Sequence, residues 1–224
     1  ESIEKHNRLS RVITAIGGLR KLENPPLTSY EFHVICLVAE VCPFDKIIGP
    51  LEETLEELKK RKTDPISYRA RVVVAGSEID DPDFTKLVEE CGLYVVADRY
   101  CYGSLPGYEE IVLREGEDAL DAIARHYLDT SQCPRFMNEE KVIGRKQYIR
   151  KLVEEYDADG VIFQAMKFCE FWGYERALGS YVLINEMDIP CCTIEREYTT
   201  SSTGQLRTRF QAFAESLEYK KLNV

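Results

Sequence analysis

The chain has 224 residues, 44% of them hydrophobic, which is enough for one large α/β domain or for one domain with a helical extension. Its formal net charge of −10 argues against general electrostatic binding of nucleic acid or of anionic membranes. No apolar run approaches the roughly 20 residues that span a bilayer. The first residues do not resemble a signal peptide, so we expect a cytoplasmic protein.

The first 70 residues have the pattern of helices. One helix is expected up to the prolines at 25–26, and a second begins after a cap near Thr28. A third helix begins near residue 45, and Pro50 should break or kink it. We therefore predict a helical linker or subdomain at 1–70.

From Arg71 onward, short apolar runs alternate with amphipathic segments. The expected strands lie at 71–76, 93–100, 160–165 and 190–197, and the expected helices at 83–92, 117–129, 146–160, 174–188 and 204–221. This alternation is typical of a mostly parallel sheet with helices on both faces. The sequence thus predicts an α/β lobe at 71–224.

Two of the eight cysteines follow predicted strands, where ligands of such sheets gather. Cys101 and Cys169 lie a few residues past the second and third strands, although a structural role for either stays open. No C-x-x-C pair indicates a zinc ribbon or a thioredoxin-type site. No histidine lies in these loops to serve as the base of a cysteine nucleophile. An iron–sulfur cluster that takes further ligands from outside the chain or from substrate is the more coherent hypothesis.

The other cysteines have weaker signals. Cys191 and Cys192 lie in a predicted strand, so they should point to opposite faces of the sheet and fill the core. Cys133 lies in a connection before a proline, and a role at the site is open for it. Structural roles are expected for the cysteines in helical segments: Cys36, Cys42 and Cys91.

The stretch "TTSSTGQLRTRF" has Ser and Thr residues and a glycine before the last predicted helix. A helix N-terminus offers free N–H groups and a partial positive charge, which suits a phosphate, an anionic cluster or a thioester oxygen. An ordinary capped helix with surface arginines explains the stretch equally well. The candidate contacts are Ser202, Gly204, Gln205 and Arg207.

Three stretches in this order, "VVVAGSEIDDPDFTKLVEECGLYVVADRYCYGS", "DGVIFQAMKFCEFWGYE" and "TGQLRTRFQAFAE", resemble the 2-hydroxyacyl-CoA dehydratase and benzoyl-CoA reductase family. The resemblance covers nearly the whole chain and implies Rossmann-like or flavodoxin-like lobes with a [4Fe-4S] cluster on three cysteines. Cys101 and Cys169 match two of these ligands. The third family ligand comes from an N-terminal lobe that has no counterpart here, so the chain looks like the C-terminal half of a family member.

The resemblance also implies a function. Family enzymes pair with a paralogous or identical subunit and receive single electrons from an ATP-dependent iron–sulfur activator. They pass these electrons to an acyl-CoA thioester in an oxidoreductase or lyase reaction, and "GSLPG" after Cys101 favours the benzoyl-CoA reductase type. Two alternatives remain: a reductase of small molecules with a double-cubane [8Fe-9S] cluster, and a non-catalytic α/β assembly fragment whose cysteines are structural.

Overall fold

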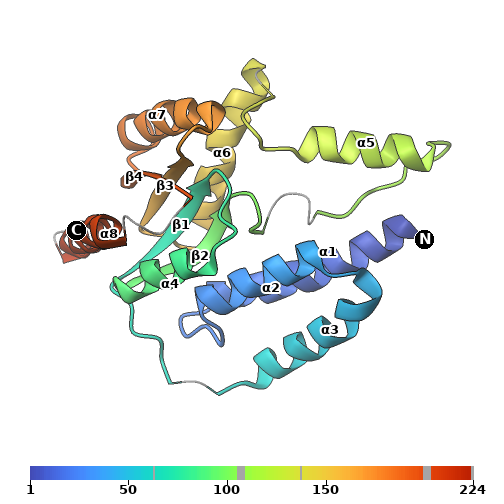
Figure 1. Cartoon of the computed structure of the whole chain (residues 1–224), viewed down its shortest axis with the longest axis horizontal. Helices are drawn as coiled ribbons and strands as arrows, with labels where there is room; N and C mark the ends of the chain where they lie inside the picture. Colours follow the sequence, from blue (N-terminus) through green and yellow to red (C-terminus); the bar gives the residue numbers. More distant parts are fainter. Residues whose placement is uncertain (63, 105–108, 137, 199–202, 223–224) are drawn as a thin grey trace.

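A parallel sheet of four strands organises the part of the chain that the structure describes (Figure 1). The computed structural model describes residues 1–224 except 63, 105–108, 137, 199–202 and 223–224. The strands are β1 (Ala70–Gly76), β2 (Leu93–Arg99), β3 (Gly160–Met166) and β4 (Cys191–Arg196). They follow the spatial order β2-β1-β3-β4, and every neighbouring pair is parallel. The predicted α/β fold with a parallel sheet is confirmed.

Helices cover both faces of this sheet, as predicted. The four helices are α4 (Pro82–Glu90), α6 (Glu139–Glu155), α7 (Glu170–Asn185) and α8 (Thr203–Leu222). Successive strand residues point to opposite faces. Val72 therefore packs in one core with Phe210 of α8, whereas Val73 packs in a second core with Trp172 of α7. The first core also takes in α4, and the second takes in α6.

The cysteines of β4 follow the same alternation. Cys191 packs against the core that includes α6 and α7, and Cys192 packs against the core that includes α4 and α8. Their predicted placement on opposite faces is therefore confirmed. Cys36 and Cys91 are buried as expected, but Cys42 is exposed at the end of its helix, so it contributes nothing to a core.

Two helices begin earlier than the sequence pattern predicted. α6 begins at Glu139 because the side chain of Asn138 accepts the Lys141 backbone N–H at 2.8 Å, which caps the helix. α7 begins at Glu170 because the Cys169 carbonyl accepts the Gly173 N–H at 2.8 Å. Cys169 thereby becomes the residue that opens a helix.

The N-terminal helices pack around a third core of their own. They are α1 (Ser2–Gly18), the single turn η1 (Leu19–Lys21), α2 (Ser29–Val41) and α3 (Phe44–Lys60). A capping box formed by Thr28 and Glu31 opens α2, in agreement with the predicted cap. Ile13, Phe32 and Leu51 belong to the shared core. A division of the chain into two domains near residue 70 stays a prediction.

Pro50 does not end the third helix. α3 continues through Pro50 to Lys60, so the expectation of a break is wrong. A proline inside a helix removes one backbone hydrogen bond. Here Ile47, Ile48 and Leu51 on either side of it are buried against the other N-terminal helices. This packing outweighs the lost bond.

His33 joins α2 to the loop after β1. Its Nε2 lies 2.9 Å from the Ile79 carbonyl oxygen, and its Nδ1 lies 2.8 Å from the Thr85 hydroxyl. Burial lowers the pKa of His33 below its ordinary value of 6.5, because the charged imidazolium would lose its hydration. His33 therefore stays neutral in the folded chain near neutral pH.

The lowered pKa of His33 should make stability depend on pH. The unfolded chain takes up a proton at the ordinary pKa and the folded chain only at lower pH, so falling pH favours unfolding. The free energy of unfolding should decrease as pH falls from about 6.5 through the lowered pKa. Urea titrations at about pH 7.5 and about pH 5.5 should show a smaller decrease in His33→Gln than in the wild type. An equal decrease in both proteins would contradict this assignment.

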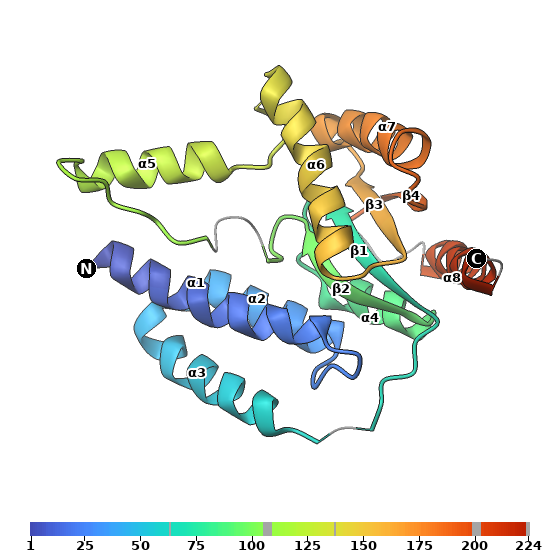
Figure 2. The ribbon, with the colours of Figure 1, turned by 180° about the vertical axis from the view of Figure 1, so that it is seen from behind.

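α5 (Ala119–Thr130) projects away from the sheet in both views (Figures 1 and 2). Only Ala122 and His126 are buried along this helix. Across the described ranges, no helix combines the length and the apolar character that crossing a bilayer requires.

Candidate functional site

The strand order creates a crevice between the carboxyl ends of β1 and β3. The chain passes from β1 to β2 on one side, and β3 then pairs with β1 on its other side. Ligands of open α/β sheets bind at such a reversal of strand order. Gly76 at the end of β1 has φ of 143°, and a Cβ there would lie 1.9 Å from the Gln164 carbonyl oxygen. Only glycine allows the two strands to approach this closely.

Ser77 joins the loop after β1 to the carboxyl end of β3. Its hydroxyl accepts the Met166 backbone N–H at 2.6 Å, and its carbonyl oxygen accepts a hydrogen bond from Gln164 Nε2 at 2.9 Å. The loop after β1 is thus fixed against the end of β3. Their residues form one wall of a pocket.

The pocket at this edge has a volume of about 550 Å³, within the range of small-molecule sites. It brings together three thiols, those of Cys101, Cys133 and Cys169. The first follows β2, the last follows β3, and Cys133 comes from the connection between α5 and α6. The other lining residues are Ser77, Glu78, Arg135, Met166, Lys167, Phe168, Glu170, Phe171 and Trp172.

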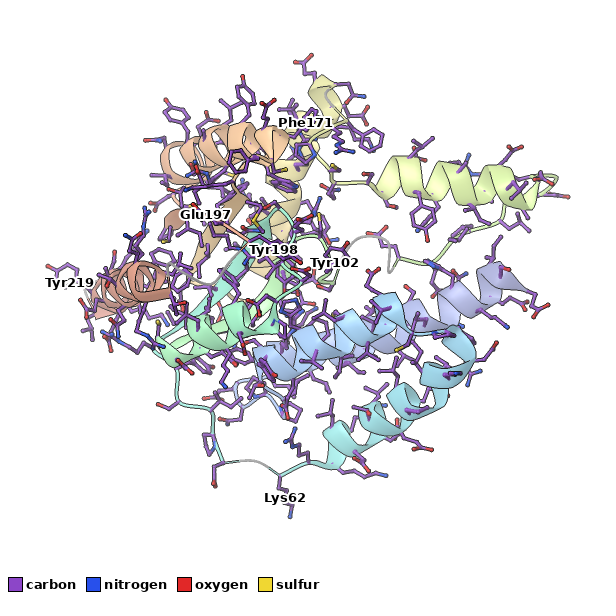
Figure 3. All side chains as sticks on the ribbon, viewed as in Figure 1. Lys62, Tyr102, Phe171, Glu197, Tyr198 and Tyr219 are labelled. Atoms are coloured by element: carbon purple, nitrogen blue, oxygen red, sulfur yellow. The ribbon has the colours of Figure 1, made fainter. Side chains whose placement is uncertain are left out.

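Cys101 is fixed by its backbone and partly shielded from solvent. Its carbonyl oxygen accepts the Ile79 N–H at 3.2 Å, which ties its loop to the loop after β1. Burial raises the pKa of the Cys101 thiol, and the nearby Arg99 guanidinium opposes that rise. The next residue, Tyr102, has φ of 69° and lies near the centre of Figure 3. A non-glycine residue in this region carries backbone strain, which often accompanies functional loops.

Cys169 lies at the first turn of α7. The N-terminus of a helix carries a partial positive charge, so an anionic group beside Cys169 would be stabilised. Phe168 before it has φ of 70°, and its side chain is 99% exposed. Each predicted cysteine therefore has a neighbour with positive φ, and of these two neighbours Phe168 lines the pocket. Phe171, labelled in Figure 3, also lines the pocket, and the centre of its ring lies 5.6 Å from the guanidinium carbon of Arg135.

Cys133 reaches the same pocket through a turn that the sequence did not indicate. The Phe136 N–H donates to the Cys133 carbonyl oxygen at 3.1 Å. The Phe136 carbonyl oxygen in turn accepts from Arg145 Nη1 at 3.1 Å. A residue that sequence reasoning left open is thus placed beside the two that it selected.

A buried arginine lies near the thiols of Cys101 and Cys133, and the described part of the chain offers it no ion partner. Arg99 ends β2 and is only 3% exposed, and its Nη1 has no hydrogen-bond partner among the described residues. Its guanidinium carbon lies 5.3 Å from the centre of the Trp172 ring. Burial lowers the pKa of Arg99 to about 10, while the thiols of Cys101 and Cys133 oppose this shift. A buried cation is costly without a negative charge beside it.

A second group of buried charges joins α6 to α7. The Glu175 carboxylate accepts from Arg145 Nη2 at 2.9 Å and from Lys146 Nζ at 3.0 Å. All three residues are less than a tenth exposed. One carboxylate faces two cations, so this cluster, like Arg99, has an excess of positive charge. Sequence reasoning missed these residues because charged side chains in a helix are usually exposed.

Almost the whole chain matches one known family. The sequence profile of the family described as "2-hydroxyglutaryl-CoA dehydratase, D-component" matches residues 1–217. The chain belongs to this family. The resemblance predicted from the three sequence stretches is thereby confirmed.

The proteins to which this chain is similar are named as dehydratase or reductase subunits. The Escherichia coli K12 protein YjiM, named as a presumed dehydratase subunit, is 28% identical over 226 residues, or 97% of this chain and 56% of that protein. The (R)-phenyllactyl-CoA dehydratase β subunit of Clostridium sporogenes is 29% identical over 169 residues, 75% of this chain and 43% of its own length. A benzoyl-CoA reductase subunit of Thauera aromatica is 22% identical over 222 residues, which cover 97% of this chain and 56% of that subunit. The chain spans about half the length of these relatives.

Of the four predicted anion contacts, the three that the structure describes lie away from the pocket. Ser202 is outside the described residues, while Gly204, Gln205 and Arg207 lie in the first turns of α8. The Arg207 guanidinium pairs with Glu90 at 2.6 Å. The Arg207 carbonyl oxygen accepts from the Cys91 thiol at 3.7 Å, at the end of α4 that precedes β2. Arg207 therefore lies near the amino end of β2, opposite the edge that holds Cys101.

The described residues include no group of three or more His, Cys, Asp or Glu side chains close enough to hold a metal ion. The three thiols surround the pocket without converging on one point. The surroundings nevertheless fit an anionic iron–sulfur cluster, because thiols line the space and the described residues place no counter-ion beside the buried Arg99. Trp172 Nε1 is also buried and has no hydrogen-bond partner within the described ranges, so its N–H is available to donate to a sulfur atom at this pocket.

Proposed function

We propose that this chain is the cluster-binding part of an acyl-CoA dehydratase or reductase that transfers single electrons to a CoA thioester. The observation that carries the proposal is that three cysteine-bearing loops line one pocket, near a buried arginine for which the described residues supply no counter-ion. Membership in the dehydratase family supports the acyl-CoA class of substrate. When bound, an iron–sulfur cluster supplies one-electron transfer at low potential.

The residues of the chain have separate tasks in this proposal. Cys101 and Cys169 ligate a [4Fe-4S] cluster as thiolates. The third ligand comes either from Cys133, which faces the same pocket, or from an N-terminal lobe outside this chain. Arg99 offsets the negative charge, and Met166 and Trp172 exclude water from one side of the pocket.

Dehydration of a 2-hydroxyacyl-CoA is the reaction that we favour over reduction of an aromatic ring. The matching family profile and the relative from Clostridium sporogenes are named for dehydratases, and the relative named for benzoyl-CoA reductase has lower identity. The preference for dehydration replaces the weak preference for the benzoyl-CoA reductase type that the "GSLPG" stretch indicated. A double-cubane [8Fe-9S] reductase and a non-catalytic assembly fragment remain the alternatives.

The proposed partners are a second family subunit and an ATP-dependent iron–sulfur activator. Relatives are named as subunits, which supports assembly with another chain. We place the candidate interface on the face of the chain that carries the pocket, because electrons must enter the pocket and acyl-CoA must approach it from that face.

Turnover assays would test the proposed function. The chain should be co-produced anaerobically with a second family subunit and supplied with the activator, ATP and a 2-hydroxyacyl-CoA. Formation of the enoyl-CoA should require every component, and benzoyl-CoA should react more slowly. Equal product formation without this chain would overturn the proposal. Ring reduction without dehydration would instead select the reductase alternative.

A further inference from the structure

The buried charge cluster between α6 and α7 lies on a continuous path between two of the pocket thiols. Cys169 opens α7, and Glu175 follows it within the same helix. Glu175 binds Arg145 of α6, and Arg145 also donates to the Phe136 carbonyl oxygen. Phe136 closes the turn that begins at Cys133. Each link on this path is a helix or a hydrogen bond of 2.9–3.1 Å.

The guanidinium of Arg145 is suited to binding two acceptors at once. Its Nη2 binds the Glu175 carboxylate while its Nη1 binds the Phe136 carbonyl oxygen. A planar fork can hold two acceptors in fixed directions, whereas a lysine ammonium cannot reproduce that geometry. Lys146 binds the same carboxylate, but its other bond, at 3.0 Å, goes to the Val142 carbonyl oxygen in its own helix. Of the two cations, Arg145 therefore has the bond to the Cys133 turn.

We infer that Arg145 is a positioning residue that holds Cys133 against the pocket of Cys101 and Cys169, which makes Cys133 the third thiol of the site. This inference deepens the proposed function, and it rests on that proposal for the identity of the group that the thiols bind, an iron–sulfur cluster. The positioning itself requires no cluster, because every bond on the path is present in the chain alone.

Thiol cross-linking in the full, iron-free and reduced chain would test the inference. A short bis-maleimide is added, and mass spectrometry of the tryptic peptides measures the Cys133–Cys169 and Cys101–Cys169 products. In Arg145→Met the Cys133–Cys169 yield should fall several-fold. The Cys101–Cys169 yield should not change, because a separate bond to the Ile79 N–H fixes the Cys101 loop.

Lys146→Met is the matched control, since it removes a neighbouring buried cation and leaves Arg145 bound to Glu175 and Phe136. It should retain the wild-type yield of both products. Arg145→Lys keeps the charge but not the fork, so it should lose the Cys133–Cys169 product as Arg145→Met does. If circular dichroism shows that Arg145→Met is unfolded, Arg145→Lys decides the question.

Several results would overturn the inference. Equal yields in Arg145→Met, Lys146→Met and wild type would show that Arg145 does not position Cys133. Parallel loss of both products would show a general loosening instead. Because the assay contains no iron, a failure of the proposed function leaves these yields unchanged. Conversely, unaffected yields in Arg145→Met would refute positioning without excluding a cluster on Cys101 and Cys169.

Discussion

Cys169→Ala is expected to abolish most iron binding by the anaerobically reconstituted chain. The substitution removes a thiolate from the start of α7, where the partial positive charge of the helix favours an anionic ligand. Cys101→Ala should have an effect of the same size. Iron per chain after gel filtration measures both losses.

Cys42→Ala is the matched control for the cysteine variants. Cys42 is a free, exposed thiol at the end of α2 and does not line the pocket. Its substitution should leave the iron content unchanged. If Cys42→Ala lowers iron as much as Cys169→Ala does, the iron is bound nonspecifically by thiols and the assignment of the site is wrong.

Asp98→Ala is expected to lower the free energy of unfolding by about 3–5 kcal/mol. Arg20 and Asp98 form a buried ion pair at 2.9 Å, with side chains 2% and 0% exposed. Removing the carboxylate leaves the Arg20 cation buried and also deprives the Ser104 N–H of its acceptor. Urea denaturation followed by circular dichroism measures the loss.

An exposed ion pair provides the comparison. Arg8 and Glu52 form a 2.6 Å pair with side chains 49% and 40% exposed, so Glu52→Ala should destabilise the chain far less than Asp98→Ala does, because solvent screens the exposed pair. Burial, and not the presence of an ion pair, sets the difference between the two variants. Similar losses for Asp98→Ala and Glu52→Ala would refute that explanation.

The sequence was sufficient to predict the sheet and two of the pocket thiols. Apolar runs such as 71–76 end at glycine and polar residues, so the strand ends and the cysteines beyond them could be located. The order of the strands was not predictable in this way, because alternation does not determine on which side of β1 the third strand pairs. The crevice between β1 and β3 depends on that order.

The parts of the site that sequence reasoning missed depend on tertiary contacts. Cys133 lines the pocket from a turn whose Phe136 carbonyl oxygen accepts a hydrogen bond from Arg145 of α6. Arg99 lies at the end of a strand, and no local pattern indicates that its guanidinium is buried behind the thiols. Arg207 was placed near an anion site by its sequence position, yet it pairs with Glu90 near the amino end of β2.

Iron content of the reconstituted 224-residue chain tests the central claim most directly. If the thiols of one pocket hold a [4Fe-4S] cluster, the chain should retain about four irons after gel filtration. The reduced protein should then give the electron paramagnetic resonance signal of such a cluster, and about eight irons would indicate the double cubane instead. Iron no higher than in the Cys101→Ala/Cys169→Ala double variant would contradict the account.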